Sequence, residues 1–285
     1  MIIQPNTEIL PAQRSHHPEL IHLLRTAERA HYHLDWQTTE GWLQRHPCYV
    51  TLSDSTPIAL LSAPVEHATV PWIRLAAVRD DETDTPTMNA LWAAARVELR
   101  QNGFTSAAAL TTHYWPEQLL PQWGFAQHGH VVMLRRNRKH QPNISNTAIG
   151  IRAATHADMQ AIFAVDQAAF DPPWRYSLWM IGLTLHLAIF TTVAYEGNDI
   201  VGYLMASQNN GKVLLARLVV TPVFQNRGVG RALTLDMLQH FAAGTSTVVE
   251  VNTQEDNVAA IALYNSLDFE LTGEHAQVWH CELNR

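Results

Sequence analysis

The sequence predicts an α/β protein made of two domains, each built on a mixed β-sheet. At 285 residues the chain is too long for one average domain and suits two. Apolar residues make up 47% of the chain and charged residues 16%, a balance typical of a folded globular protein. Stretches with strand and helix periodicity alternate in both halves, which favours sheets covered by helices on both faces.

In the second half, a strand is expected at 149–152, and a helix follows from Asp158. Five later stretches predict strands, at 189–195, 200–206, 213–221, 247–252 and 277–283. Three predict helices, at 176–187, 228–243 and 257–267. The turn at 196–199 joins the first two of these strands as a hairpin.

The first half repeats this order in a blurred form. Helices are expected at 18–32 and 88–101, a hairpin at 49–61 and a strand at 104–110. Residues 115–123 lead into Gly124-Phe125 as residues 263–267 lead into Asp268-Phe269. An internal duplication with a period of roughly 140 residues accounts for the likeness. The charged, proline-containing stretch 135–143 has the composition of a linker. We therefore expect domains at 1–138 and 148–285.

A glycine-rich turn in the second half has the features of a pyrophosphate-binding loop. The strand that ends at Pro222 is followed by a Gly-x-Gly turn at Gly228 and Gly230, which opens a helix. Such a turn gathers backbone N–H groups at the positive end of a helix dipole. Arg227 and Arg231 add positive charge beside it. The turn lacks the Lys-Ser/Thr of a Walker A loop and the third glycine of a dinucleotide fingerprint, and by itself it also suits a purely structural turn.

A second motif follows on the next strand and helix. Asn257 is a good helix N-cap, and Tyr264 lies two helical turns later, on the same face and about 10 Å along the axis. An amide and a phenol on one face could contact a long, thin ligand. Asp268 stands at the helix C-terminus, where the chain favours a residue that tolerates a left-handed conformation.

Together, the stretches 225–230 and 257–269 resemble the two motifs of the GCN5-related N-acetyltransferase (GNAT) family, over roughly residues 149–285. The resemblance implies two tandem acyl-CoA N-acyltransferase (GNAT-like) domains and acetyl-CoA as co-substrate, with no metal. The residues that the resemblance assigns to the cofactor are Leu218, Val219, Val220, Gln225, Asn226, Arg227, Gly228, Val229, Gly230, Arg231, Asn257 and Tyr264.

The resemblance also implies direct attack of a neutral amine on the thioester. The N–H of Val220 would polarise the carbonyl, and Tyr264 would donate a proton to the departing sulfur. The family's glutamate on the strand before the loop is missing here. Glu250 is our candidate base, with His280, a water chain or a plain surface role for Glu250 as alternatives.

The acceptor stays open from sequence. The segment 169–176 is similar to the acceptor-side loop of ribosomal-protein alanine N-acetyltransferases, whereas the tandem arrangement resembles that of mycothiol synthases. A peptide amine and a small-molecule amine are both possible acceptors. In the first half, Asp80, Asp81, Glu82 and Asp84 stand where the phosphate loop would be, so we expect that half to be a degenerate copy without CoA.

The best prediction is an acetyl-CoA-dependent N-acetyltransferase; a non-catalytic acetyl-CoA-binding sensor or scaffold is the alternative. The net charge of −7 disfavours a nucleic-acid regulator. No zinc spacing occurs among the 16 histidines, and the two cysteines suggest buried thiols. The uncharged stretch 176–195 is expected to be a buried helix and strand rather than a membrane span. A cytoplasmic monomer or homodimer is expected.

Overall fold

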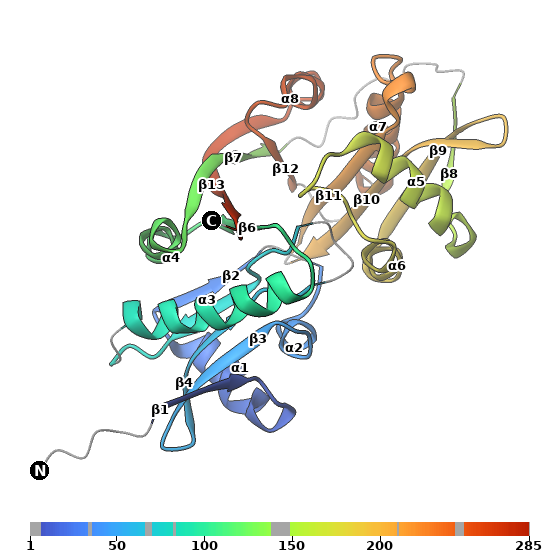
Figure 1. Ribbon diagram of the computed structural model, residues 1–285. Coiled ribbons are helices and arrows are strands. Elements are labelled where there is room, and N and C mark those ends of the chain that lie inside the picture. Colours follow the sequence, from blue (N-terminus) through green and yellow to red (C-terminus); the bar gives the residue numbers. More distant parts are fainter. Residues whose placement is uncertain are drawn as a thin grey trace, which may run out of the picture. The chain divides into compact units, whose positions relative to one another are not determined.

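The computed structural model describes residues 7–33, 36–65, 70–81, 84–137, 149–209, 211–242 and 248–284 (Figure 1). The chain divides into two compact units. Unit 1 holds residues 1–129 and 276–285, and unit 2 holds residues 130–275.

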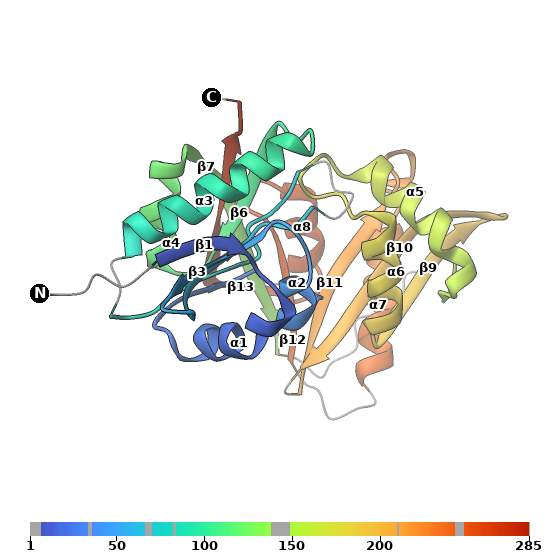
Figure 2. The same cartoon turned by 60° about the horizontal axis from the view of Figure 1, so that its bottom comes forward.

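Unit 1 contains a five-stranded sheet in the order β1-β3-β4-β5-β2. The five strands of this sheet are β1 (Thr7–Pro11), β2 (Arg29–Tyr32), β3 (Cys48–Ser53), β4 (Thr56–Ser62) and β5 (Leu75–Val78). Unit 1 also contains β6 (Ser106–Thr111), which lies outside this sheet. Its helices are α1 (His17–Thr26), α2 (Thr39–Leu43), α3 (Asp84–Gln101) and α4 (Tyr114–Leu119), with short 3₁₀ turns at Arg14–His16 and Leu120–Trp123. Figure 2 shows α1 and α3 on opposite faces of this sheet, which explains why β4 is buried on both faces.

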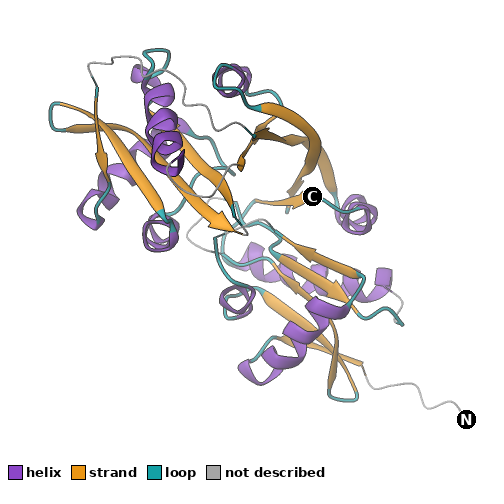
Figure 3. Cartoon of the chain, turned by 180° about the vertical axis from the view of Figure 1, so that it is seen from behind, coloured by secondary structure: helices purple, strands orange, loops and turns teal. Residues whose placement is uncertain are grey.

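In unit 2 the strand order is β13-β7-β12-β11-β10-β9-β8. The strands are β7 (Phe125–Arg136), β8 (Gly150–Ala153), β9 (Phe190–Glu196), β10 (Asp199–Asn209), β11 (Lys212–Val220), β12 (Val248–Gln254) and β13 (Glu270–Glu282). The helices are α5 (Met159–Ala169), α6 (Leu178–Leu187), α7 (Val229–Ala242) and α8 (Val258–Asn265), with 3₁₀ turns at His156–Asp158 and Pro222–Phe224. Helix α5 packs on β10 and β11, and α7 packs on the other face (Figures 2 and 3). Unit 2 therefore has the expected mixed sheet with helices on both faces. The five-stranded sheet of unit 1 also has helices on both faces, but its strands are all antiparallel.

Strand β7 begins in unit 1, but its residues 131–136 pair with β12 inside unit 2. Strand β13 begins in unit 2, but its residues 277–282 pair with β6 inside unit 1. Trp279, Cys281 and Leu283 accordingly lie in the hydrophobic core of unit 1. Each unit is thus completed by a strand from the other half of the sequence.

Two expectations about individual segments were wrong. The helix expected at 18–32 ends at Thr26, because residues 29–32 form β2 and pair with β5. The stretch expected as a linker begins inside β7, where Arg135 pairs with Glu250 and the Arg136 Nε donates to the Leu267 carbonyl. Charge composition misled there, because these arginines have specific acceptors. The rest of that stretch, from residue 138, lies outside the described residues.

The uncharged stretch 176–195 divides into α6 and β9, as expected. Within the described ranges, no helix is both long and apolar enough to cross a membrane.

The exchanged strand makes a matched pair of variants informative. Leu283→Ala, at a position with no solvent exposure, should destabilise unit 1 by about 2–5 kcal/mol, since it opens a cavity in that core. Leu271→Ala, on the part of β13 that belongs to unit 2, should be nearly neutral because Leu271 is 58% exposed. Limited trypsin digestion should cut the first variant after Arg96 or Arg100 of α3. Equal stability of the two variants would contradict the assignment of the C-terminal strand to unit 1.

Candidate active site

In unit 2, part of the edge of β11 that faces β12 is unpaired. Residues 212–215 of β11 pair in parallel with residues 248–251 of β12, and the pairing ends there. The register of β10 against β11 shifts at the same point, because Met205 faces Arg217 whereas Ala206 faces Leu215. Ala216 is therefore the extra residue of a β-bulge, a feature that bends a strand away from its neighbour. In the described structure, no strand covers this edge beyond the bulge.

Strand geometry decides which main-chain groups face the open edge. The Thr221 N–H donates to the Val201 carbonyl on β10, so residues 219 and 217 also direct their main-chain groups to β10. Leu218 and Val220 direct theirs to the open edge. The Val220 carbonyl accepts from the Gln225 Nε2 at 3.1 Å, while its N–H has no partner within the part of the chain that the structure describes. Of the three predicted main-chain contacts, two therefore face the gap, and Val219 faces β10.

The predicted phosphate loop connects β11 to α7. Asn226 and Gly228 both adopt left-handed backbone conformations, with φ of 59° and 82°. Asparagine and glycine tolerate this region best, which explains these residue types here. Helix α7 begins at Val229, so the N–H groups of its first turn have no partner within the helix. The loop therefore presents backbone donors at the N-terminus of a 14-residue helix.

Three other residues predicted in this loop contact neighbouring side chains of unit 2. The Arg227 guanidinium stacks on the ring of Phe224, 5.0 Å from its centroid. The Arg231 Nη1 donates to the Ser266 Oγ at 2.8 Å, which ties α7 to the end of α8. A Cβ on Gly230 would lie 3.3 Å from the Leu263 Cδ2. This glycine therefore allows α7 to pack closely on α8, a reason for glycine that the sequence did not reveal.

Helix α8 carries the second predicted motif. The Asn257 Oδ1 caps the helix by accepting from the Ala260 N–H at 3.1 Å, which leaves its amide NH₂ available. Tyr264 is 4% exposed and packs on Phe269, with ring centroids 5.6 Å apart. Among the described residues its hydroxyl has no hydrogen-bond partner, and burial raises the pKa of the phenol well above its usual value. At neutral pH the Tyr264 hydroxyl is thus protonated, and it donates its hydrogen to none of the described residues. As expected, Asp268 is left-handed, with φ of 64°.

Glu250 lies on β12, opposite Leu214 of β11. Its Oε1 accepts from the Arg135 Nε at 2.7 Å and from the Lys212 Nζ at 3.1 Å. Burial of Glu250 raises the pKa of the carboxyl, but these two cations outweigh burial and leave the pKa below its ordinary value. Its Oε2 has no partner in the described ranges. Glu250 is therefore an ionised carboxylate with one open oxygen, and a weak base.

A buried cluster that the sequence analysis missed lies on the α5 side of the sheet. Asp166 has no solvent-exposed side-chain area and forms an ion pair with Arg217 at 2.6 Å. The Tyr203 hydroxyl donates to the same carboxylate. Two features of the sequence could have indicated this cluster: an aspartate within the apolar pattern of α5, and an arginine within β11. The 51 residues that separate the two partners gave no reason to pair them.

The corresponding edge in unit 1 is closed. The Ile73 N–H donates to the Ala108 carbonyl, so the chain bonds to β6 only just before β5 begins. Residues 75–78 then pair with β2, the strand that replaced the expected end of a helix. The acidic stretch that follows includes an ion pair between Arg79 and Asp81, and residues 82–83 lie outside the described chain. Unit 1 therefore lacks an open strand edge at this place.

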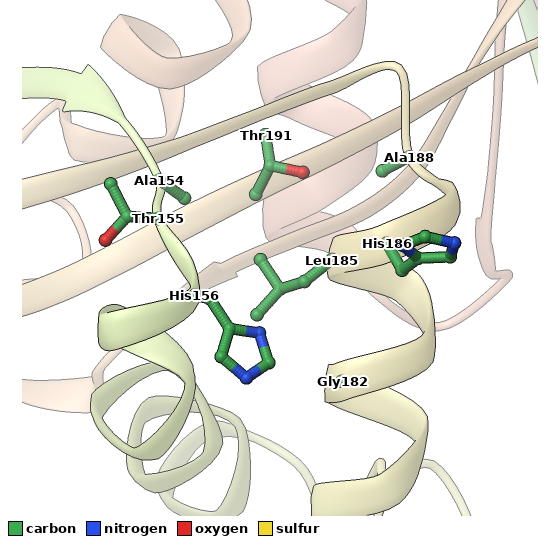
Figure 4. Close-up of a pocket in the computed structure, with 8 residues that line it drawn as sticks. All are labelled: Ala154, Thr155, His156, Gly182, Leu185, His186, Ala188 and Thr191. Carbon is green, nitrogen blue, oxygen red and sulfur yellow. The ribbon is translucent and has the colours of Figure 1, made fainter.

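A cleft of about 390 Å³ lies in unit 2, between the start of α5 and the C-terminal end of α6 (Figure 4). It is lined by Ala154, Thr155, His156, Gly182, Leu185, His186, Ala188 and Thr191. None of these residues belongs to the predicted site. Over the part of the chain that is described, no group of three or more His, Cys, Asp or Glu side chains is arranged to hold a metal ion.

Comparisons with known proteins agree with this arrangement. The family model of the acetyltransferase (GNAT) family matches residues 157–269. The N-alpha-acetyltransferase RimI of Mycobacterium tuberculosis is 32% identical over 131 residues, which cover 44% of this chain and 80% of that protein. A spermine/spermidine N(1)-acetyltransferase of Bacillus subtilis is 30% identical over 89 residues, but these cover 28% of this chain and only 58% of that protein.

A likeness in fold extends over both units. The structure of a tandem GNAT protein from the clavulanic acid biosynthesis pathway superposes on this chain with a TM-score of 0.68. The superposition covers 98% of this chain and 99% of that protein. At 17% identity that likeness concerns the fold alone. The expected pair of GNAT-like folds is thereby confirmed. The chain belongs to the GNAT acetyltransferase family, in its tandem form.

Proposed function

We propose that unit 2 transfers the acetyl group of acetyl-CoA to a primary amine of a small molecule or peptide. The observation that carries the proposal is the open edge of β11, where Leu218 and Val220 present main-chain groups directly before a loop of backbone donors. A pantetheine arm can pair with such an edge as a strand would, while the pyrophosphate binds the N-terminus of α7.

In this proposal Glu250 binds the acceptor amine and Tyr264 acts as the general acid. The acceptor amine binds as an ammonium beside the open Oε2 of Glu250, which the neighbouring cations keep ionised. The amine loses its proton to solvent and attacks the thioester carbonyl, whose oxygen the Val220 N–H stabilises. The tetrahedral intermediate then expels CoA as Tyr264 donates its proton to the leaving sulfur. The former amine nitrogen loses its second proton as the amide forms, and solvent returns a proton to Tyr264. Glu250 serves to hold the acceptor rather than to remove its proton, because its pKa is lowered.

Unit 1 has no cofactor in this proposal. Where unit 2 leaves an edge open, unit 1 pairs that edge with β2, and Asp80 and Asp81 follow directly. Unit 1 instead supplies a folded partner that receives the C-terminal strand of the chain.

Calorimetric titration with acetyl-CoA tests the cofactor and its location. One site per chain is expected. The double variant Arg227→Glu/Arg231→Glu should weaken binding about tenfold or more, a cost of about 1.4 kcal/mol or more, because it places two negative charges beside the pyrophosphate. Arg25→Glu/Arg100→Glu, which makes the same change in net charge on exposed helix positions of unit 1, should bind as the parent does. Equal loss in both double variants, or two sites per chain, would contradict the proposed location.

The roles of Tyr264 and Glu250 predict opposite kinetic changes. Tyr264→Phe should lower kcat on the order of 100-fold, because the sulfur leaves without a proton, and leave the acceptor KM unchanged. Glu250→Gln should mainly raise the acceptor KM. Since burial raises the pKa of Tyr264, the parent rate should increase with pH as the amine deprotonates and should not fall again below about pH 10. A Tyr264→Phe variant with the parent's rate would contradict the acid role of Tyr264. A parent protein that binds acetyl-CoA but acetylates no amine would leave an acetyl-CoA-binding sensor as the better account.

A further inference from the structure

The bulge in β11 decides which way Arg217 points. Side chains alternate between the two faces of a strand, and Val213, Leu215, Leu218 and Val220 all pack on the α7 side. The extra residue, Ala216, is what allows positions 215 and 218 to share that face. Arg217 therefore points to the opposite face, toward α5, where its side chain is only 9% exposed.

Arg217 there contacts the segment between α5 and α6 at several points. Its Nη2 donates to the Trp174 carbonyl at 2.8 Å, and its guanidinium carbon lies 4.1 Å from the ring centroid of Phe170 and 3.6 Å from that of Tyr176. Its Nε donates to Asp166 at 2.7 Å. The other oxygen of Asp166 accepts from the Tyr176 N–H at 2.8 Å. One buried ion pair thus fixes both the backbone and the rings of residues 170–176.

This segment lies next to the reactive end of the cofactor, a step that rests on the proposed function. The pyrophosphate cradle follows β11, so the pantetheine arm passes Val220 first and Leu218 second. The thioester then lies toward the bulge, and Arg217 is the next residue along the strand. The Arg217 guanidinium covers one face of the Phe170 ring and one face of the Tyr176 ring, so those two faces are closed to a cationic acceptor.

We propose that Arg217 is a positioning residue for acetyl transfer, because it holds residues 170–176 beside the thioester as a wall of the acceptor site. Three polar partners, the Asp166 carboxylate, the Tyr203 hydroxyl and the Trp174 carbonyl, accept from the planar guanidinium, and two rings lie against it. A lysine ammonium cannot stack and donate in that forked geometry. The strand position next to the thioester is thus occupied by a cation and not by a base. This cation, Arg217, holds residues 170–176 in place.

The test compares Arg217→Met and Arg217→Lys with Arg152→Met. The control breaks another Arg–Asp pair of unit 2, in which Arg152 contacts Asp158 at 2.7 Å beside the other end of α5. Acetyl-CoA affinity is measured by calorimetry. Turnover is measured as thiol release in an equal mixture of an alanine-first peptide and spermidine, which represent both amine classes. Amide hydrogen exchange of Tyr176 reports the segment itself and needs no acceptor.

Both Arg217 variants should bind acetyl-CoA within twofold of the parent, yet release thiol about 10–100-fold more slowly, the effect of a misplaced reactant. Exchange at Tyr176 should speed up in Arg217→Met and stay unchanged in Arg152→Met, which should also keep the parent's turnover. A folded Arg217→Met with parental turnover, or with unchanged exchange at Tyr176, would overturn the proposal. A parallel loss of acetyl-CoA affinity would overturn it too, since it would place Arg217 in the cofactor site.

Removing one member of a buried ion pair can prevent folding, because the other charge stays buried and unpaired. The double variant Asp166→Asn/Arg217→Met removes both charges and carries the same expectations. A parent protein that fails to bind acetyl-CoA would contradict the proposed function instead. The exchange at Tyr176 would then still decide whether Arg217 holds the segment.

Discussion

The bulge at Ala216 is the local constraint on which the candidate site depends. It ends the pairing of β11 with β12, so that Leu218 and Val220 face an unpaired edge. It also shifts the alternation of side chains by one residue. As a result, Leu218 and Val220 pack on the α7 side of the sheet, and Arg217 points toward α5. The proposed cofactor edge, the start of the phosphate loop and the wall of the acceptor site thus all depend on one extra residue in β11.

Apart from the additional strand β2, the two halves of the chain use the same order of strands and helices, but they differ at this edge. In unit 1, β2 pairs with residues 75–78 and satisfies the main-chain groups that would otherwise receive a ligand. In unit 2 these groups stay available. A short strand of four residues is thus enough to close this edge while the rest of the fold is kept.

The local patterns of the sequence predicted most of unit 2 and the proposed phosphate loop. Hydrophobic periodicity located α7 and β11, and the left-handed conformation of Asp268 was expected from its place at a helix C-terminus. The missed features all depend on distant partners. Residues 29–32 continue a helical pattern locally, but pairing with β5 makes them a strand. Likewise, neither the exchange of β7 and β13 nor the Asp166–Arg217 pair has a signature in adjacent residues.

The central claim is that the cofactor completes the open edge of β11 in the way a strand would. Amide hydrogen exchange with and without acetyl-CoA tests this most directly. The account predicts that acetyl-CoA slows exchange at the Val220 and Leu218 amides, while Val219, already directed to β10, and residues 75–78 of unit 1 keep their rates. Protection confined to residues 75–78, or unchanged exchange at Val220 under saturating acetyl-CoA, would contradict it.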